Sequence, residues 1–336
     1  MQNKVGFELE QICERCSLIH RKCDTFSCNV IVFLFLITRF TNMKHTIDHV
    51  IFIVKDLSRS VENYKLLLGR NPSWKGSHPA FKTKNALFRL NNTYIELLAE
   101  DDVQKDGSPE GGMTFVGEYL SRKGPGLAGL SFGTSDASNL VKHLNEHGIE
   151  ALGPMQAEGT DTLTGAVRHW LNVFWPNSIS RGLWTFGIEH LDPISTLPIA
   201  PPITSEREDE IVDAVDHIVI NTKDLEAAKY FYRDILGIRL ALELKDHPFG
   251  SMLFFKSNKM VIEVVKSADM KNEEDEFWGI AYKTNNVQLT QERLLKSGVK
   301  VSDVRKGMKA GTLVCTIKSH NLGVPTLLIG PTISEE

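Results

Sequence analysis

Apolar and polar residues alternate along the chain in a pattern that recurs. In its clearest form, an apolar run with strand character leads to an aspartate, then to a helical stretch that ends at a glycine. This form surrounds Asp48-His49 and returns around Asp216-His217. Aspartate is a common helix N-cap and glycine a common helix stop, so each copy is predicted to be a strand followed by a helix.

A weaker form of the same pattern occupies residues 127–148 and 278–298. Short apolar or alternating runs follow each unit, for example 85–90 and then 94–98, and these runs are typical of strands. The chain is therefore predicted to contain four βαβββ modules, and the repetition itself is the strongest signal for the fold.

A segment rich in proline and acidic residues separates the second module from the third. Residues 191–212 contain four prolines and the run Glu206-Arg-Glu-Asp-Glu210, which is typical of a linker. We therefore expect one domain at 43–190 and a second at 213–332, a division that the length of 336 residues allows.

The first 42 residues differ in character from the rest. Four of the five cysteines lie there, before an apolar run at 29–37 that is too short to cross a bilayer as a helix. A signal peptide and a zinc site are weaker interpretations, because no small-residue cleavage site follows and the cysteine spacing fits no finger pattern. We expect an extension that is unstructured or not translated, with the folded chain starting at Met43.

Composition narrows the class of function. The net charge is only -4, and no basic stripe or block of like charge is present, which argues against nucleic acid as a partner. The body of the chain holds a single cysteine, which fits a reducing compartment. We expect a cytoplasmic protein, monomeric or homodimeric, that binds a small molecule and no membrane.

With these modules the sequence resembles the vicinal-oxygen-chelate superfamily over about residues 44–331. The first domain is similar to the glyoxalase-like branch through His78-Pro79, Thr83-x-Asn85 and Tyr94-Ile-Glu-Leu-Leu98. The second resembles glyoxalase/bleomycin-resistance/dioxygenase domains. The resemblance implies an α+β fold of two fused domains, each a pair of βαβββ modules that form an open eight-stranded barrel.

The resemblance also implies a site for a divalent metal (Mn, Fe, Ni or Zn), with ligands from the first and last strand of each module. The matching residues in this chain are His49, Glu96, Glu189, His217 and Glu263. Two first-strand positions depart from the pattern, since they hold Gly129 and Gly279, and the last strand of the fourth module offers no acid.

The residues alone leave these assignments open. An acid between apolar strand residues either faces solvent or points inward, where it needs a metal, an arginine or a histidine as partner. A lone strand histidine is likewise more often a core or surface residue than a ligand.

The pairing of modules decides which residues share a site. If neighbouring modules pair, the first barrel holds His49, Glu96 and Glu189, and the second holds His217 and Glu263. If the first module pairs with the fourth, Glu189 joins the second set instead. The position of the linker favours the sequential pairing.

Further polar residues are candidates for catalysis. His78 precedes a proline ahead of a strand and is either an acid-base group at the rim of the site or simply part of a turn. Glu189 is a candidate for a displaceable catalytic carboxylate. Arg168 and His169 are polar candidates that the pattern does not place.

The resemblance favours a metal-dependent, glyoxalase-like enzyme with lyase or isomerase chemistry on a small oxygenated substrate. Dioxygenase chemistry is less favoured, because the position of its second histidine holds Gly129. The alternative is a metal-free binding protein of the bleomycin-resistance type, and a third possibility is a structural or regulatory role for the second domain.

Overall fold

The computed structural model describes residues 45–101, 114–203, 207–245, 247–248 and 250–332. The expectations for residues 1–42 lie outside this range. Of the helices described, none has the length and apolar character needed to cross a bilayer.

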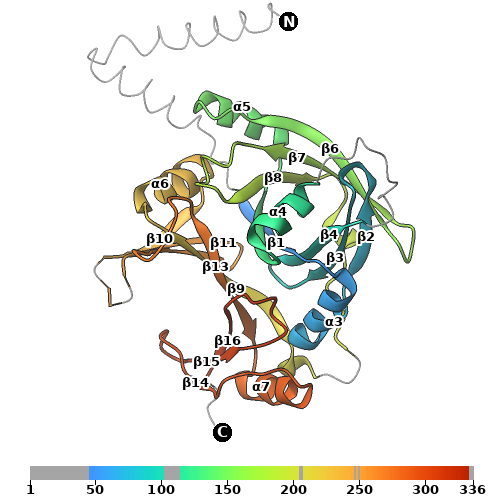
Figure 1. Ribbon diagram of the computed structural model, residues 1–336, viewed down its shortest axis with the longest axis vertical. Helices are drawn as coiled ribbons and strands as arrows, with labels where there is room; N and C mark the ends of the chain where they lie inside the picture. Colours follow the sequence, from blue (N-terminus) through green and yellow to red (C-terminus); the bar gives the residue numbers. More distant parts are fainter. Residues whose placement is uncertain (1–44, 102–113, 204–206, 246, 249, 333–336) are drawn as a thin grey trace, which may run out of the picture. The chain divides into compact units, whose positions relative to one another are not determined.

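The first two modules form one closed barrel of eight strands in the order β1-β4-β3-β2-β6-β7-β8-β5 (Figure 1). Its elements are β1 (Thr46–Ile53), α3 (Leu57–Leu68), β2 (Trp74–His78), η1 (Pro79–Phe81), β3 (Thr83–Arg89), β4 (Tyr94–Glu100), α4 (Phe115–Lys123), β5 (Gly126–Gly133), α5 (Ala137–Glu146), β6 (Leu152–Asp161), β7 (Val167–Phe174) and β8 (Trp184–His190).

The third and fourth modules form an eight-stranded sheet in the order β10-β11-β12-β9-β13-β16-β15-β14, which does not close. Its elements, with two short helices before them, are η3 (Ile194–Thr196), η4 (Glu208–Glu210), β9 (Val212–Thr222), α6 (Leu225–Lys229), η5 (Tyr230–Ile235), β10 (Arg239–Leu244), β11 (Met252–Ser257), β12 (Met260–Lys266), β13 (Glu276–Thr284), α7 (Val287–Lys296), β14 (Arg305–Lys306), β15 (Thr312–Ile317) and β16 (Thr326–Pro331).

The predicted fold class is confirmed, as is the pairing of neighbouring modules. β1 pairs antiparallel with β5 and so joins the first module to the second, and β9 pairs antiparallel with β13 in the same way. The two sheets differ from the expected open barrels in opposite directions, because the first closes through β2 and β6 while the second stays uncurled.

The four predicted caps also form. The side chains at the N-caps of α3, α5, α6 and α7 accept hydrogen bonds from backbone N–H groups of the first turn; these residues are Asp56, Asp136, Asp224 and Asn286. At Gly69 the chain leaves α3 with φ of 70°, in the left-handed region where glycine has no steric penalty.

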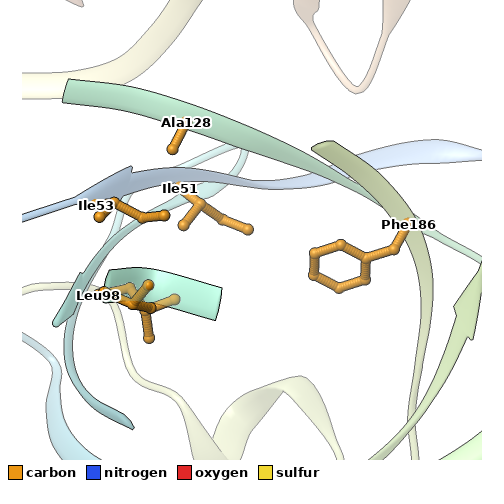
Figure 2. Packing of buried hydrophobic residues seen from close by; sticks show 6 residues of the cluster. Ile51, Ile53, Leu98, Ala128 and Phe186 are labelled. Carbon is orange, nitrogen blue, oxygen red and sulfur yellow. The ribbon is translucent and has the colours of Figure 1, made fainter. Parts of the chain in front are cut away.

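The core of the barrel follows the two-residue alternation of its strands. One buried cluster joins β1, β4, β5, β8 and α4, and Figure 2 shows its members, which are Ile51, Ile53, Leu98, Val116, Ala128 and Phe186. On the other face of β1, Phe52 packs edge-on against Tyr64 of α3. Side chains on one face of each strand therefore point into the barrel, and those on the other face are covered by helices.

Arg293 of α7 links the last module to the first helix. Its side chain is 5% exposed. The guanidinium donates to the carbonyl oxygens of Leu66 and Leu67 in the last turn of α3, at 2.6 and 3.1 Å, and to that of Glu210 at 2.8 Å. Carbonyls at a helix C-terminus have no partner within the helix and carry partial negative charge, which a buried cation compensates.

We expect Arg293→Met to lower the free energy of unfolding by about 3 kcal/mol, because three buried carbonyl oxygens lose a charged donor. The measurement is urea unfolding followed by circular dichroism. Arg59→Met, the same chemical change at an exposed position of α3, is the control and should cost about 0.5 kcal/mol or less. Equal midpoints for the two variants would contradict this role.

Candidate functional site

A cavity of about 380 Å³ lies inside the closed barrel. Alternate residues of its strands line the cavity, and the list by element is His49 of β1; Trp74 and His78 of β2; Phe81 of η1; Thr83, Asn85 and Leu87 of β3; Tyr94, Glu96 and Leu98 of β4; Phe115 and Val116 of α4; Gly159 of β6; Arg168, Trp170, Asn172 and Phe174 of β7; and Trp184, Phe186, Ile188 and His190 of β8.

His49 lies between two carboxylates at the wall of this cavity. Its Nδ1 is 2.7 Å from Oδ1 of Asp48, and its Nε2 is 3.4 Å from Oε2 of Glu96. Because Asp48 can only accept, Nδ1 of His49 carries a proton and Nε2 faces Glu96. His49 and Glu96 are only 3% and 8% exposed, so this is a buried ion pair.

A row of polar side chains continues from Glu96 along the barrel. Nδ2 of Asn85 donates to Oε1 of Glu96 at 2.7 Å and lies 3.3 Å from Nε2 of His78. Nδ1 of His78 is 3.0 Å from Oγ1 of Thr83. Since Asn85 presents an N–H there, Nε2 of His78 is the acceptor, and Nδ1 carries the proton that bonds Thr83.

The row also continues from Asp48 in the other direction. Nε2 of His190 lies 3.1 Å from both carboxylate oxygens of Asp48, and Nδ1 of His190 lies 3.4 Å from Nη2 of Arg168. A guanidinium only donates, so Nδ1 of His190 accepts and its Nε2–H donates to Asp48. Eight side chains from Thr83 to Arg168 are therefore connected around the cavity.

Aromatic rings form much of the remaining wall. Tyr94 stacks on the imidazole of His49 with 4.4 Å between ring centroids, and Trp170 meets His78 edge to face at 5.6 Å. The guanidinium carbon of Arg168 lies 5.8 Å from the ring centroid of Trp74. A cavity with aromatic walls and few polar groups suits a small ligand that is mostly apolar.

The environment drives the pKa values of the two cavity histidines apart. Burial alone would lower the pKa of His49, but the hydrogen bonds and charges of Asp48 and Glu96 raise it to about 9. Burial lowers the pKa of His78. Burial opposes ionisation of Glu96, yet contacts with His49 and Asn85 hold its pKa below the ordinary value. At neutral pH His49 is thus charged and His78 neutral.

The structure does not bring Glu189 to this site. It precedes His190 in β8, so the two side chains point to opposite faces of the strand. Oε2 of Glu189 instead accepts from the backbone N–H of Ala137 at 2.7 Å, at the start of α5. The expected set of His49, Glu96 and Glu189 is therefore not assembled.

Strand register explains why Glu189 and Glu96 are not equivalent. In the first module His49 pairs with Tyr94, two residues before Glu96. In the second module Gly129 pairs with Trp184, so the residue equivalent to Glu96 is Phe186. A Cβ at Gly129 would lie 2.6 Å from Cε3 of Trp184, so the indole fills the space that a histidine there would need.

The second domain repeats the pair in a weaker form. Nδ1 of His217 is 2.9 Å from Asp216, and its Nε2 is 3.8 Å from Oε2 of Glu263. The register is that of the first module, but Met252 occupies the place of Asn85. Burial raises the pKa of Glu263, the opposite of the direction found for Glu96.

The residues present fit half of a metal site. Two ligand atoms that each lie about 2.1 Å from a cation, with an angle near 90° at the cation, are about 3 Å apart. Nε2 of His49 and Oε2 of Glu96 are 3.4 Å apart, which is close to that separation. Asp48 behind His49 and Asn85 behind Glu96 are the hydrogen-bond partners that such ligands usually have. Within the described ranges, however, no three His, Cys, Asp or Glu side chains are close enough to hold an ion.

Sequence reasoning missed Asp48, Asn85, His190 and the placement of Arg168 as parts of the site. Asn85 was visible only as part of the resemblance, without a role. Counting in steps of two from Trp184 reaches His190 and passes over Glu189, so strand alternation carried the signal for His190.

Comparison with known families agrees with this architecture. Residues 47–204 match the Glyoxalase-like domain, and residues 214–321 match the Glyoxalase/Bleomycin resistance protein/Dioxygenase superfamily. The chain belongs to the vicinal-oxygen-chelate superfamily. Among curated proteins, none matches the sequence closely enough to count as a relative.

Solved structures share the fold at low identity. A hypothetical protein from Staphylococcus aureus has 15% identity and a TM-score of 0.58, covering 84% of this chain and 98% of its own. A mutant 4-hydroxymandelate synthase from Streptomyces coelicolor has 14% identity and a TM-score of 0.58, and the match covers 88% of this chain and 94% of that one. The Mn(II)-bound glyoxalase from Novosphingobium aromaticivorans has 15% identity and a TM-score of 0.56, and the match covers 86% of this chain and 82% of that one.

We expect Asp48→Asn to lower the pKa of His49 from about 9, because the amide removes one of the two carboxylate charges that raise it while burial remains. The measurement is NMR titration of the imidazole Cε1–H with a chelator present, with the resonance assigned by its absence in His49→Gln. Asp216→Asn, in the second domain, should leave this titration unchanged. A pKa near 9 in Asp48→Asn would rule out the proposed cause.

The same shift fixes the direction of the pH dependence of stability. Because the pKa of His49 in the folded protein lies above its ordinary value of 6.5, its contribution to stability is fully present below pH 6.5 and is lost as the pH rises through about 9. We therefore expect the free energy of unfolding to fall between pH 6.5 and 9 in the parent protein, and to fall less in His49→Gln.

Proposed function

We propose that the first domain is an enzyme that moves a proton on a small, mostly apolar molecule at a carbon next to a carbonyl group. The observation that carries the proposal is the connected row of polar side chains, with two histidines of opposed pKa shift, inside a cavity with aromatic walls. Pairs of titratable groups whose pKa values are driven apart are typical of an acid and a base in one site.

His78 is the proposed base. Its pKa is lowered by burial, so the imidazole is neutral at pH 7, and the lone pair of its Nε2 accepts from Asn85 across a long 3.3 Å hydrogen bond that a substrate proton would replace. The hydrogen bond from Nδ1 to Thr83 fixes the ring tautomer. Transfer of a substrate proton to Nε2 leaves the electron pair on the substrate, where the carbonyl oxygen takes the negative charge.

His49 is the proposed partner for that oxygen. In the metal-free protein its Nε2–H is a charged donor that faces Glu96 at the wall of the cavity, a substrate oxygen would share this donor with the carboxylate, and Asp48 stabilises the imidazolium behind it. Charge that develops on a substrate oxygen is stabilised best by donors that are already in place before the reaction. Asn85 holds Glu96, so that the carboxylate and His49 keep one relative orientation.

A divalent cation also suits this site. His49 Nε2 and Glu96 would hold it, with water or substrate oxygen completing its coordination, and it would supply polarisation of the substrate oxygen. The Mn(II)-bound glyoxalase of similar fold makes Mn(II) the first ion to test. The related pair His217 and Glu263 in the second domain is a weaker candidate for the same ion.

A metal-free binding protein is the second candidate function. It is favoured by the second module, where Trp184 and Phe186 occupy the positions that would complete a metal site. In that case the cavity holds an apolar ligand and the polar row only orients it.

We expect the full-length protein to bind about one equivalent of Mn(II), measured by electron paramagnetic resonance after removal of other metals. Glu96→Gln should weaken binding at least roughly tenfold, because a charged ligand is lost, and Glu189→Gln should leave it unchanged. Equal weakening of Mn(II) binding in the two variants would instead support the ligand set expected from the sequence, which includes Glu189. No binding by the parent would support the second candidate.

Proton exchange tests the acid-base proposal without a known product. We expect the parent protein to accelerate exchange of the methylene protons of phenylacetone in D2O, followed by proton NMR. His78→Gln should slow the catalysed rate by roughly 10²- to 10⁴-fold, and Glu189→Gln should not. Exchange at the parent rate in His78→Gln would eliminate His78 as the base.

A further inference from the structure

Arg168 is a buried cation that forms no ion pair with a carboxylate of the residues that the structure describes. The side chain is 5% exposed, and its Nε has no hydrogen-bond partner. Its described contacts are a 3.4 Å hydrogen bond to Nδ1 of His190 and the face of Trp74. An unpaired buried charge is costly, and an anion from outside the chain removes that cost when it binds.

The charged groups near Arg168 include Arg89, which repels it, and Asp192, whose pKa is lowered in part by the charge of Arg168. The pKa of Arg89 is lowered by burial and further by the charge of Arg168, which shows that the two guanidinium groups repel. Arg89 donates to the carbonyl oxygens of Ile194 and Leu197 and brings no carboxylate to the region. Asp192 is engaged by the backbone N–H and the ring of His169.

A second polar group shares this part of the cavity. Asn172 lies four residues after Arg168 on the same face of β7, and Trp170 stands between them. Asn172 is 5% exposed, and its Oδ1 has no partner. The guanidinium offers the planar set of donors that a carboxylate accepts, and Nδ2 of Asn172 is a further donor, while Oδ1 of Asn172 can accept from a polar hydrogen of the ligand.

We propose that Arg168, with Asn172, binds the carboxylate of a small aromatic carboxylic acid whose ring lies against the indoles of Trp74 and Trp170. In the hydrogen-bonded row, His190 and Asp48 lie between Arg168 and His49. The carboxylate is therefore at a different part of the ligand from the group that meets His49. The substrate class rests on the proposed function, whereas carboxylate binding does not.

The experiment compares phenylacetate with phenylacetamide, which has the same shape and no charge, by isothermal titration calorimetry with a chelator present. The full-length parent is expected to bind phenylacetate at least roughly tenfold more tightly. Arg168→Met should weaken phenylacetate binding by roughly ten- to a hundredfold and leave phenylacetamide binding unchanged. Arg122→Met, an exposed arginine of α4, controls for the loss of one positive charge.

Equal affinity of the parent for the two compounds overturns the proposal, and this comparison needs no variant to fold. Equal weakening by Arg122→Met overturns it as well, because long-range charge would then explain the effect. Arg168→Lys, which keeps the charge but not the planar set of donors, should recover part of the affinity.

Mn(II) binding and proton exchange separate this result from the proposed function. If the parent neither binds Mn(II) nor exchanges phenylacetone protons, but prefers phenylacetate through Arg168, then the carboxylate site stands and the proposed enzyme does not. If both activities are present and phenylacetate shows no preference, the enzyme stands and the carboxylate site falls.

Discussion

The close contact of three ionised groups, the buried His49 and Glu96 and the partly buried Asp48, is the constraint on which the site depends. Each would be costly in an apolar barrel, and together they are tolerated because the imidazolium lies between the two carboxylates. The remaining oxygens then need donors, which Asn85 and His190 supply. The polar residues of the cavity are thus required by one another, and Arg168 at the end of the row lacks an anionic partner among the described residues.

The two modules of the barrel contribute different kinds of residue to the cavity. The first module supplies the charged groups, while the second supplies Trp184 and Phe186 at the equivalent register positions. In the second domain His217 and Glu263 keep the same register, but no asparagine stands at the position equivalent to Asn85. The distance between the imidazole and the carboxylate is longer there, and the ionised form of Glu263 is less stabilised. Duplication has therefore preserved the strands better than the polar contacts around them.

The fold could be predicted from the sequence because the four modules repeat caps, glycine stops and apolar runs, each of which acts locally. Repetition and resemblance singled out His49, Glu96 and His78, and all three line the cavity, while their roles stay predictions. Glu189 was misplaced because its distance from the strand start was not known without the register of β5 against β8. Arg168 could not be placed for the same kind of reason, since a barrel interior is formed by residues distant in sequence, whereas alternation from Trp184 does point to His190.

The contact between Gly129 and Trp184 also limits how this site can change over generations. A histidine at 129 would restore the missing first-strand ligand, but its Cβ would collide with the indole. A smaller residue at 184 must therefore appear first, and it would open a void in the cavity wall before any ligand fills it. Each of these two substitutions is unfavourable when it occurs alone. The difference between the first and the second module at this position is therefore hard to reverse by single substitutions.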